Sequence, residues 1–230
     1  MVDKKAFRSL SCGLYIVTAR GAQGSVGCVV NTFQQVTSSP AQASIAINKD
    51  NVTTAAILES GMFEVSVLCE DAPMELIGRF GFHSSADTDK FADTQTAQDA
   101  AGIAYVTEHA AAHFCLKAAQ TLDLGTHMLV VGEVVEAAVL SDGALMTYAY
   151  YHQVKGGKTP PKASSYEGDG AAAAALSSEA QGASAHDAAP RRFAWRCTVC
   201  GHIEYVDELP DDFRCPLCGV GKELFERIEL

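Results

Sequence analysis

The chain has 230 residues, 48% hydrophobic and 20% charged, which excludes disorder throughout and leaves room for one medium domain and one small domain. Its formal net charge of -11 disfavours nucleic acids and anionic membrane surfaces as partners, because both are polyanionic. No window approaches 18 uncharged apolar residues and no apolar run follows the charged start, so we expect a cytoplasmic protein without a membrane span or secretory signal.

Most elements predicted within the first 160 residues are β-strands. Short β-branched or alternating runs, separated by glycine, asparagine and proline, predict strands at 14–19, 25–31, 44–48, 62–68, 103–108, 113–121 and 127–139. The last run is long enough to bend or bulge at Gly132. Roughly seven strands predict a closed or nearly closed barrel, so the expected fold class is mainly β.

Two predicted helices interrupt the strands. The first has Asn51 as its N-cap and Gly61 just past its end, and a shorter helix follows Pro73. The chain shows no long βαβ alternation and no G-x-G-x-x-G fingerprint, which argues against a Rossmann sheet.

Small hydroxyl and amide side chains gather in residues 29–40 and 47–55. Lys49 and Thr53, at the start of the helix capped by Asn51, would combine a cation, a hydroxyl and free helix N–H groups, a set that suits the phosphate of a nucleotide-like ligand. The alternative is that these residues form turns and β-sheet surface, where serine and threonine are common.

Four cysteines of this region stand among apolar residues, which predicts buried thiols in a reducing compartment and not a disulfide framework. They are Cys12, Cys28, Cys69 and Cys115.

The composition changes abruptly after residue 162. Residues 163–190 contain 11 Ala, 5 Ser and 3 Gly, with almost nothing to bury. A flexible chain of this length spans roughly 30 Å. We therefore expect a barrel domain at 1–162, an Ala/Ser/Gly-rich linker at 163–192 and a metal-binding domain at 193–230.

Two C-x-x-C pairs stand in the last segment with 14 residues between them: Cys197, Cys200, Cys215 and Cys218. This spacing predicts four thiolates around one tetrahedral metal ion and leaves zinc and iron open. The glycine after each pair allows backbone amides to turn toward sulfur, and such donors raise the reduction potential of an iron centre.

Residues 193–229, FAWRCTVCGHIEYVDELPDDFRCPLCGVGKELFERIE, resemble a rubredoxin domain, in particular the shortened form found in rubrerythrins. The resemblance implies a single iron held by four cysteines that carries one electron between Fe(III) and Fe(II). A structural zinc site is the alternative.

Residues 1–160 resemble the flavin reductase family, an FMN-binding split β-barrel, in FRSLSCGLYIVTA, NTFQQVTSSP, NKDNVT and GTHMLVVGEVVEA. The resemblance implies a homodimer with FMN near the subunit interface. It places Asn31 and Thr32 at the isoalloxazine or ribityl, Thr37 and Ser38 at the polar edge or ribityl, and Asn48, Lys49 and Thr53 at the phosphate end.

The resemblance also marks His127 as the candidate catalytic residue, near flavin and nicotinamide; a partly buried histidine bonded to the backbone is the alternative. Residues 147–165 resemble a closing tail in which Tyr151, Lys155 and Gly156 would cover the flavin, with solvated surface as the alternative. Phe82 or His83 would reach the site from the dimer partner.

Together the two resemblances point to high molecular weight rubredoxins of anaerobes. They imply an NAD(P)H-dependent oxidoreductase that passes electrons through FMN to the iron and on to a partner such as a flavodiiron protein. The alternative is an electron-carrier module that binds flavin and iron and is reduced by another protein. NADH and NADPH both stay open, because no dinucleotide fingerprint is present.

Overall fold

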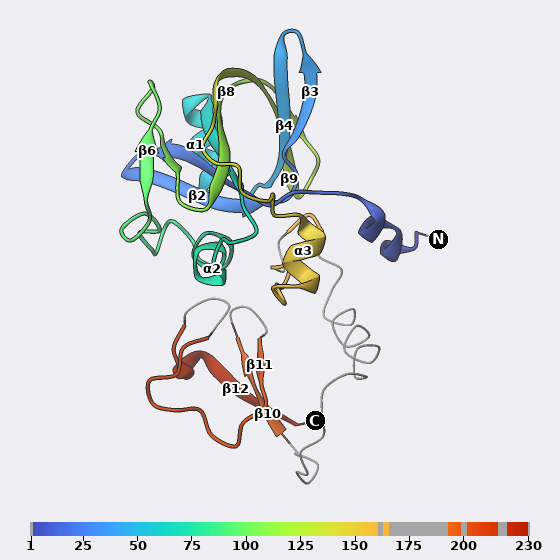
Figure 1. Cartoon of the computed structure of the whole chain (residues 1–230), viewed down its shortest axis with the longest axis vertical. Helices are drawn as coiled ribbons and strands as arrows, with labels where there is room; N and C mark the ends of the chain where they lie inside the picture. The colour runs from blue at the N-terminus through green and yellow to red at the C-terminus, as the bar shows by residue number, and fades with distance from the viewer. Residues whose placement is uncertain (1, 161–162, 166–192, 199–201, 216–219, 230) are drawn as a thin grey trace.

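A computed structural model describes residues 2–160, 163–165, 193–198, 202–215 and 220–229. They form a β-barrel with helices and a small three-stranded tail sheet, and α2 and α3 lie on the side of the barrel nearer the tail sheet (Figure 1). The predicted linker at 163–192 lies outside the described residues from 166 onward, and so do Cys200 and Cys218.

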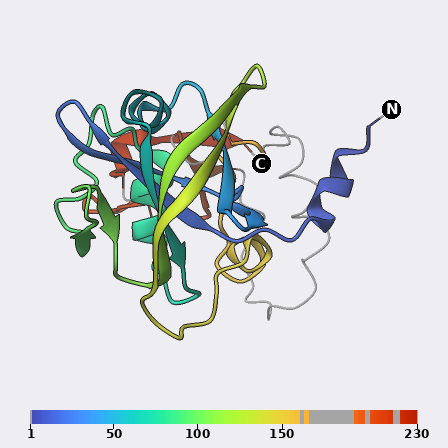
Figure 2. The same ribbon diagram turned by 90° about the horizontal axis from the view of Figure 1, so that it is seen from above.

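The barrel is built from a seven-stranded antiparallel sheet with the strand order β2-β1-β5-β8-β9-β4-β3. The strands are β1 (Tyr15–Gly21), β2 (Gly24–Val30), β3 (Gln34–Ser38), β4 (Ala41–Asn48), β5 (Met62–Leu68), β8 (Ala110–Asp123) and β9 (His127–Val139). Cys28 of β2, Ile45 of β4 and Phe63 of β5 belong to one buried cluster, so the sheet curls around a common interior. Figure 2 shows the long β8–β9 ribbon crossing the barrel.

Helix α1 (Val52–Ser60) packs against this interior through Ala56 and Ile57. The Asn51 side chain accepts a hydrogen bond from the Thr53 amide, and Gly61 ends the helix with φ of 69°. A left-handed residue at this position favours glycine, because a Cβ would be strained there. Both predicted caps are confirmed.

Helix α2 (Met74–Phe82) follows Pro73 as predicted, whereas α3 (Tyr148–Gln153) was not predicted. The short length of α3 gives it little periodic signal, although the Thr147 hydroxyl caps its first turn. Both helices pack on the outer side of the barrel, in a second cluster that contains Leu14, Ile77 and Tyr151. A 3-10 helix, η1 (Lys4–Ser9), precedes the barrel. Within the described residues, no helix has the length and apolarity needed to cross a bilayer.

Three strand details differ from the sequence expectations. Strand β3 was assigned to a loop because every one of its residues is exposed, so it carries no alternation of apolar side chains. Strand β6 (Thr96–Gln98) pairs with β7 (Ala104–Val106) in a separate hairpin. The register shifts of the β8–β9 ladder fall at Val135 and Ala119, while Gly132 is regularly paired with Ala43 and Ala118, so the predicted bulge at Gly132 was wrong.

The tail sheet has the order β11-β10-β12, with β10 (Phe193–Cys197), β11 (Ile203–Glu204) and β12 (Phe225–Glu229), and η2 (Lys222–Leu224) precedes β12. Its small core contains Cys197, Leu209, Cys215 and Phe225. The Phe213 ring meets Phe225 edge-on at 5.2 Å between centroids. So few buried side chains make this unit depend on a further source of stability.

Candidate flavin pocket and metal knuckles

A pocket lies where β2 and β4 of the barrel meet α2, α3 and the chain that follows α3. Its apolar wall includes Val30, Ile47 and Phe80. Its polar lining includes Asn31, Asn48, Asn51, His127 and Lys158. An apolar wall with a few convergent amide, imidazole and ammonium groups is typical of a cofactor site.

Asn48 and His127 are brought together as direct partners in the β4–β9 ladder. The ring Nδ1 of His127 lies 2.9 Å from the Thr126 hydroxyl. Partial burial lowers the pKa of His127, which favours the neutral ring at neutral pH. The imidazole can therefore accept or donate one hydrogen bond at the pocket wall without adding a charge.

Asn31 connects the barrel to the chain beyond α3. Its amide nitrogen donates to the Ser165 hydroxyl at 3.5 Å, and its carbonyl oxygen accepts from Ser164 at 3.4 Å. The Tyr148 hydroxyl lies 2.7 Å from the hydroxyls of both Ser165 and Thr159. The three residues 163–165 thus form part of the pocket wall.

The closing segment is shaped by contacts with Tyr151. Tyr151 is buried, and its hydroxyl donates to the Lys158 carbonyl at 2.9 Å. A Cβ at Gly157 would stand 2.2 Å from the Tyr151 ring, so only glycine fits this close approach. Tyr151 lines the pocket, whereas Lys155 and Gly156 do not.

Other residues that the sequence placed at the site have other neighbours in the structure. The Thr32 hydroxyl donates to the Ala46 carbonyl at 2.7 Å and accepts from the Ala46 amide at 3.1 Å, which joins the end of β2 to β4. Thr37 and Ser38 are exposed on β3, and Thr37 donates to the Pro40 carbonyl at 2.6 Å. None of these three lines the pocket in the described chain.

The expected phosphate seat is also divided. The ammonium of Lys49 pairs with Asp123 at 2.5 Å, across the β8–β9 turn. The Thr53 side chain is fully buried, and its hydroxyl has no hydrogen-bond partner among the described residues. The basic side chain that lines the pocket is Lys158, and Asn51 contributes from the helix cap.

Sequence reasoning missed four further lining residues: Asn51, Phe82, Tyr148 and Lys158. Phe82 and His83 were expected from a dimer partner, but both line the pocket of their own chain. The aromatic run of residues 148–151 carried a signal, because several large rings beside a Gly-Gly turn are costly to leave in water.

The tail contains two knuckles built on the same plan. The Cys197 amide donates to the His202 carbonyl at 2.8 Å, and the Cys215 amide donates to the Val220 carbonyl at 2.8 Å. Each bond spans five residues and closes a loop that starts with a cysteine. Cys197 and Cys215 are both buried in the tail core. Two such loops supply thiolate donors, a set that fits iron as well as zinc.

Helix α2 is close to this metal-binding unit as well as to the pocket. Met74 and Phe82 pack against the cluster of Cys197, Cys215 and Phe225. Phe82 also lines the pocket. One side chain therefore contacts both regions.

The family comparisons agree with this geometry. The flavin reductase like domain matches residues 7–157, more than half of the chain. The chain belongs to the flavin reductase family. The rubredoxin-like domain of rubrerythrin matches residues 195–226, so the family's domain is joined here to a rubredoxin-like one.

Relatives and solved structures share one or both domains. A high molecular weight rubredoxin of Moorella thermoacetica is 38% identical, over 99% of this chain and 100% of the relative. A ferric-chelate reductase (NAD(P)H) of Archaeoglobus fulgidus is 46% identical, over 72% of this chain and 98% of the relative. The solved NADH:FAD oxidoreductase SgcE6 of Streptomyces globisporus C-1027 is 25% identical, with a TM-score of 0.58 over 64% of this chain and 90% of that one.

These matches confirm the resemblance to high molecular weight rubredoxins and the mainly β fold. They also confirm that the chain is an enzyme of the NAD(P)H-dependent flavin reductase type, joined to a rubredoxin-like domain.

Proposed function

We propose that the enzyme passes electrons from NAD(P)H through FMN in the pocket to one iron ion and then to a separate redox protein. The iron would be held by Cys197, Cys200, Cys215 and Cys218. The observation that carries the proposal is the position of Phe82, which lines the pocket and packs against the cysteine cluster of the tail. Electrons can pass between two centres that are held this close in one chain.

Bound FMN would accept a hydride from nicotinamide as an electron pair and release the electrons one at a time to the iron. The amide side chains of Asn31 and Asn48 would bind its polar ring edge or ribityl chain. His127, kept neutral by partial burial, would donate or accept one hydrogen bond near the reacting face. Lys158 would neutralise part of the phosphate charge.

Thr37, Ser38, Lys49 and Thr32 take part in this proposal through the homodimer. The exposed edge strand β3 offers unpaired backbone groups that a second copy can cover. A second copy would thereby place Thr37 and Ser38 beside a flavin at the interface, while Thr32 fixes the β2–β4 connection and Lys49 exchanges Asp123 for phosphate. Thr53 would act through its backbone amide at the start of α1.

An anaerobic titration of the purified full chain tests the function. NADH or NADPH should bleach the flavin absorption first and the thiolate-to-Fe(III) bands afterwards. Flavin that stays oxidised with both nicotinamides would favour the electron-carrier alternative. A tail that contains zinc and no iron would exclude electron transfer through it.

A Cys197→Ser variant separates the two centres. It should abolish the iron bands and leave the reduction of flavin by nicotinamide unchanged. Loss of flavin reduction with FMN still bound would contradict the proposed division of roles. In the cytoplasm, a flavodiiron protein that reduces oxygen or nitric oxide would be a suitable acceptor, and reoxidation of the iron on mixing with such a protein would test this step.

A further inference from the structure

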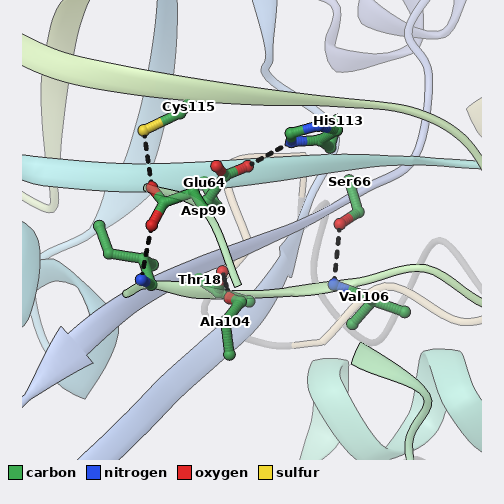
Figure 3. Close-up of polar contacts among 9 residues, drawn as sticks. Thr18, Glu64, Ser66, Asp99, Ala104, Val106, His113 and Cys115 are labelled. Carbon is green, nitrogen blue, oxygen red and sulfur yellow. Dashed lines mark hydrogen bonds and ion pairs between the residues drawn. The ribbon is translucent and has the colours of Figure 1, made fainter. Parts of the chain in front are cut away.

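A buried polar cluster lies away from the flavin pocket, between the outer face of the sheet and the β6–β7 hairpin (Figure 3). Glu64 of β5 and Cys115 of β8 are direct partners across the ladder. Phe63 and Val65 belong to the barrel core, and the Ser66 hydroxyl accepts from the Val106 amide at 3.1 Å on the hairpin side. Glu64 therefore faces the hairpin rather than the barrel interior.

Asp99 approaches this pair from the loop of the hairpin. Its Oδ2 lies 2.9 Å from the Cys115 sulfur. Its Oδ1 accepts from the Ile103 amide at 2.7 Å, and its backbone bonds to Ile103 and Gly102 hold the loop in a tight turn. Gly102 has φ of 75°, which favours glycine at that turn. The loop thus fixes the direction of the Asp99 carboxylate.

The cluster is dry and rich in negative charge. Glu64 has no exposed surface, Cys115 is 2% exposed and Asp99 is 8% exposed. Burial and the Asp99 carboxylate raise the pKa of Glu64 to about 8. Placing two carboxylates side by side out of water is costly unless a cation neutralises them.

Glu64 has one oxygen in use and one without a partner. Oε2 lies 3.2 Å from Nδ1 of His113. Oε1 is buried and has no hydrogen-bond partner among the described residues. Figure 3 shows Glu64 between His113 on one side and Asp99 with Cys115 on the other, so the second oxygen faces the aspartate and the thiol. A buried acceptor without a donor is the arrangement expected of a metal ligand.

His113 is held in place from two directions. It is 2% exposed, and its ring stacks on Tyr105 with 4.0 Å between centroids and an angle of 4°. A histidine that donates to a ligating carboxylate orients that ligand and increases its affinity for the metal. His113 is therefore a positioning residue for Glu64.

We propose that Glu64, Asp99 and Cys115 bind a zinc ion that fixes the β6–β7 hairpin to the outer face of the barrel, with His113 orienting Glu64. One donor atom from each of the three residues lies within 4.8 Å of the other two. An ion with bonds of about 2.0–2.3 Å bridges such a set after small side-chain rotations. A thiolate beside two carboxylates suits zinc better than calcium or magnesium, which take oxygen ligands only.

Binding replaces the Cys115 thiol proton, which is released to solvent, and leaves a fourth position for a water molecule. The three ligands come from β5, β8 and the hairpin loop. The ion would therefore join parts of the chain that are far apart in sequence. We assign it a structural role, because the cluster shares no residue with the flavin pocket.

Metal content of the full chain tests the site. After incubation with zinc alone and gel filtration, iron and zinc are counted per chain by mass spectrometry. Cys115→Ser should hold one metal equivalent fewer than the wild type, with unchanged iron bands from the tail. Cys69→Ser is the matched control, because Cys69 is also a buried thiol of the barrel but lies outside the cluster. Equal metal content in wild type and Cys115→Ser would overturn the proposal.

His113→Gln tests the positioning role. The variant should bind zinc about 10–100-fold more weakly, and full occupancy should return at high zinc concentration. A variant with unchanged zinc affinity would show that His113 does not act through Glu64.

A measurement on the wild type covers the case in which Cys115→Ser does not fold. Alkylation of Cys115 and Cys69 is followed by peptide mass spectrometry, with zinc or with a chelator. Zinc at a hundred times its dissociation constant should slow the alkylation of Cys115 by about a hundredfold, because only the zinc-free form opens, and should leave Cys69 unchanged. Equal slowing of both cysteines, or of neither, would contradict a site at Cys115.

Discussion

The barrel and the tail bind redox centres with opposite means of support. The barrel has a continuous apolar interior that includes Ile45, Ile57 and Phe63. The tail has four buried core residues, of which two, Cys197 and Cys215, are metal ligands by our proposal. A large core holds a pocket open without its ligand, whereas a small core of this kind requires its metal in order to fold.

The strongest test of this comparison is removal of the tail metal. In Cys215→Ser, the site should lose binding energy on the order of 10 kcal/mol. We expect β10–β12 to lose protection from hydrogen exchange completely, with unchanged protection in β1, β5 and β8. Retained protection in the tail strands would show that the aromatic contacts are sufficient without the metal.

A barrel cavity should have the converse effect. Phe63 is fully buried, so Phe63→Ala should lower the free energy of unfolding of the barrel by about 3–5 kcal/mol. Chemical denaturation followed by flavin release should show an earlier transition, and the iron bands should be unchanged. If the iron bands disappeared in the same transition, the two domains would be a single cooperative unit.

Gly157→Ala tests how closely the pocket is packed. The added methyl group would overlap the Tyr151 ring, and overpacking of this kind costs about 1–3 kcal/mol. We expect FMN to bind roughly tenfold more weakly by fluorescence titration, an effect that falls within that range. Lys155→Ala is the control, since Lys155 is nearby but does not line the pocket, and equal losses in both variants would indicate general destabilisation.

The smallest expected effect concerns a buried lysine beneath α2. Lys90 is 2% exposed and donates to the Gly27 and Phe80 carbonyls at 2.8 and 3.1 Å. Burial lowers its pKa from 10.5 to about 8. Above pH 8 the unfolded chain holds more protons at this position than the folded chain, so stability should rise with pH between about 8 and 10.5.

The slope from Lys90 should be at most about 1.4 kcal/mol per pH unit. Lys90→Met removes this contribution and also leaves two carbonyl groups without a donor. Urea denaturation at several pH values should therefore show a wild-type stability that rises relative to that of the variant above pH 8. Parallel curves would mean that Lys90 titrates normally.

Local chemistry explains what could be predicted from sequence. The caps at Asn51 and Gly61 depend on residues within one helical turn, and both were found as expected. The flavin pocket was predicted only in part: Asn31, Asn48 and His127 line it, but Lys49 and Thr53 point elsewhere. Proximity along the chain placed these last two at the site, whereas the direction of each side chain depends on strands β8 and β9 and on the core.

The sequence by itself determined the class of each domain, because strand periodicity, helix caps and the cysteine spacing are local signals. The tertiary structure alone decided that the exposed segment 34–38 is an edge strand and that Phe82 serves the pocket of its own chain. It also decided that Glu64, Asp99 and Cys115 meet in one dry cluster. The physical reason is that strand pairing brings distant residues together, and no local pattern records which residues will face each other across a ladder.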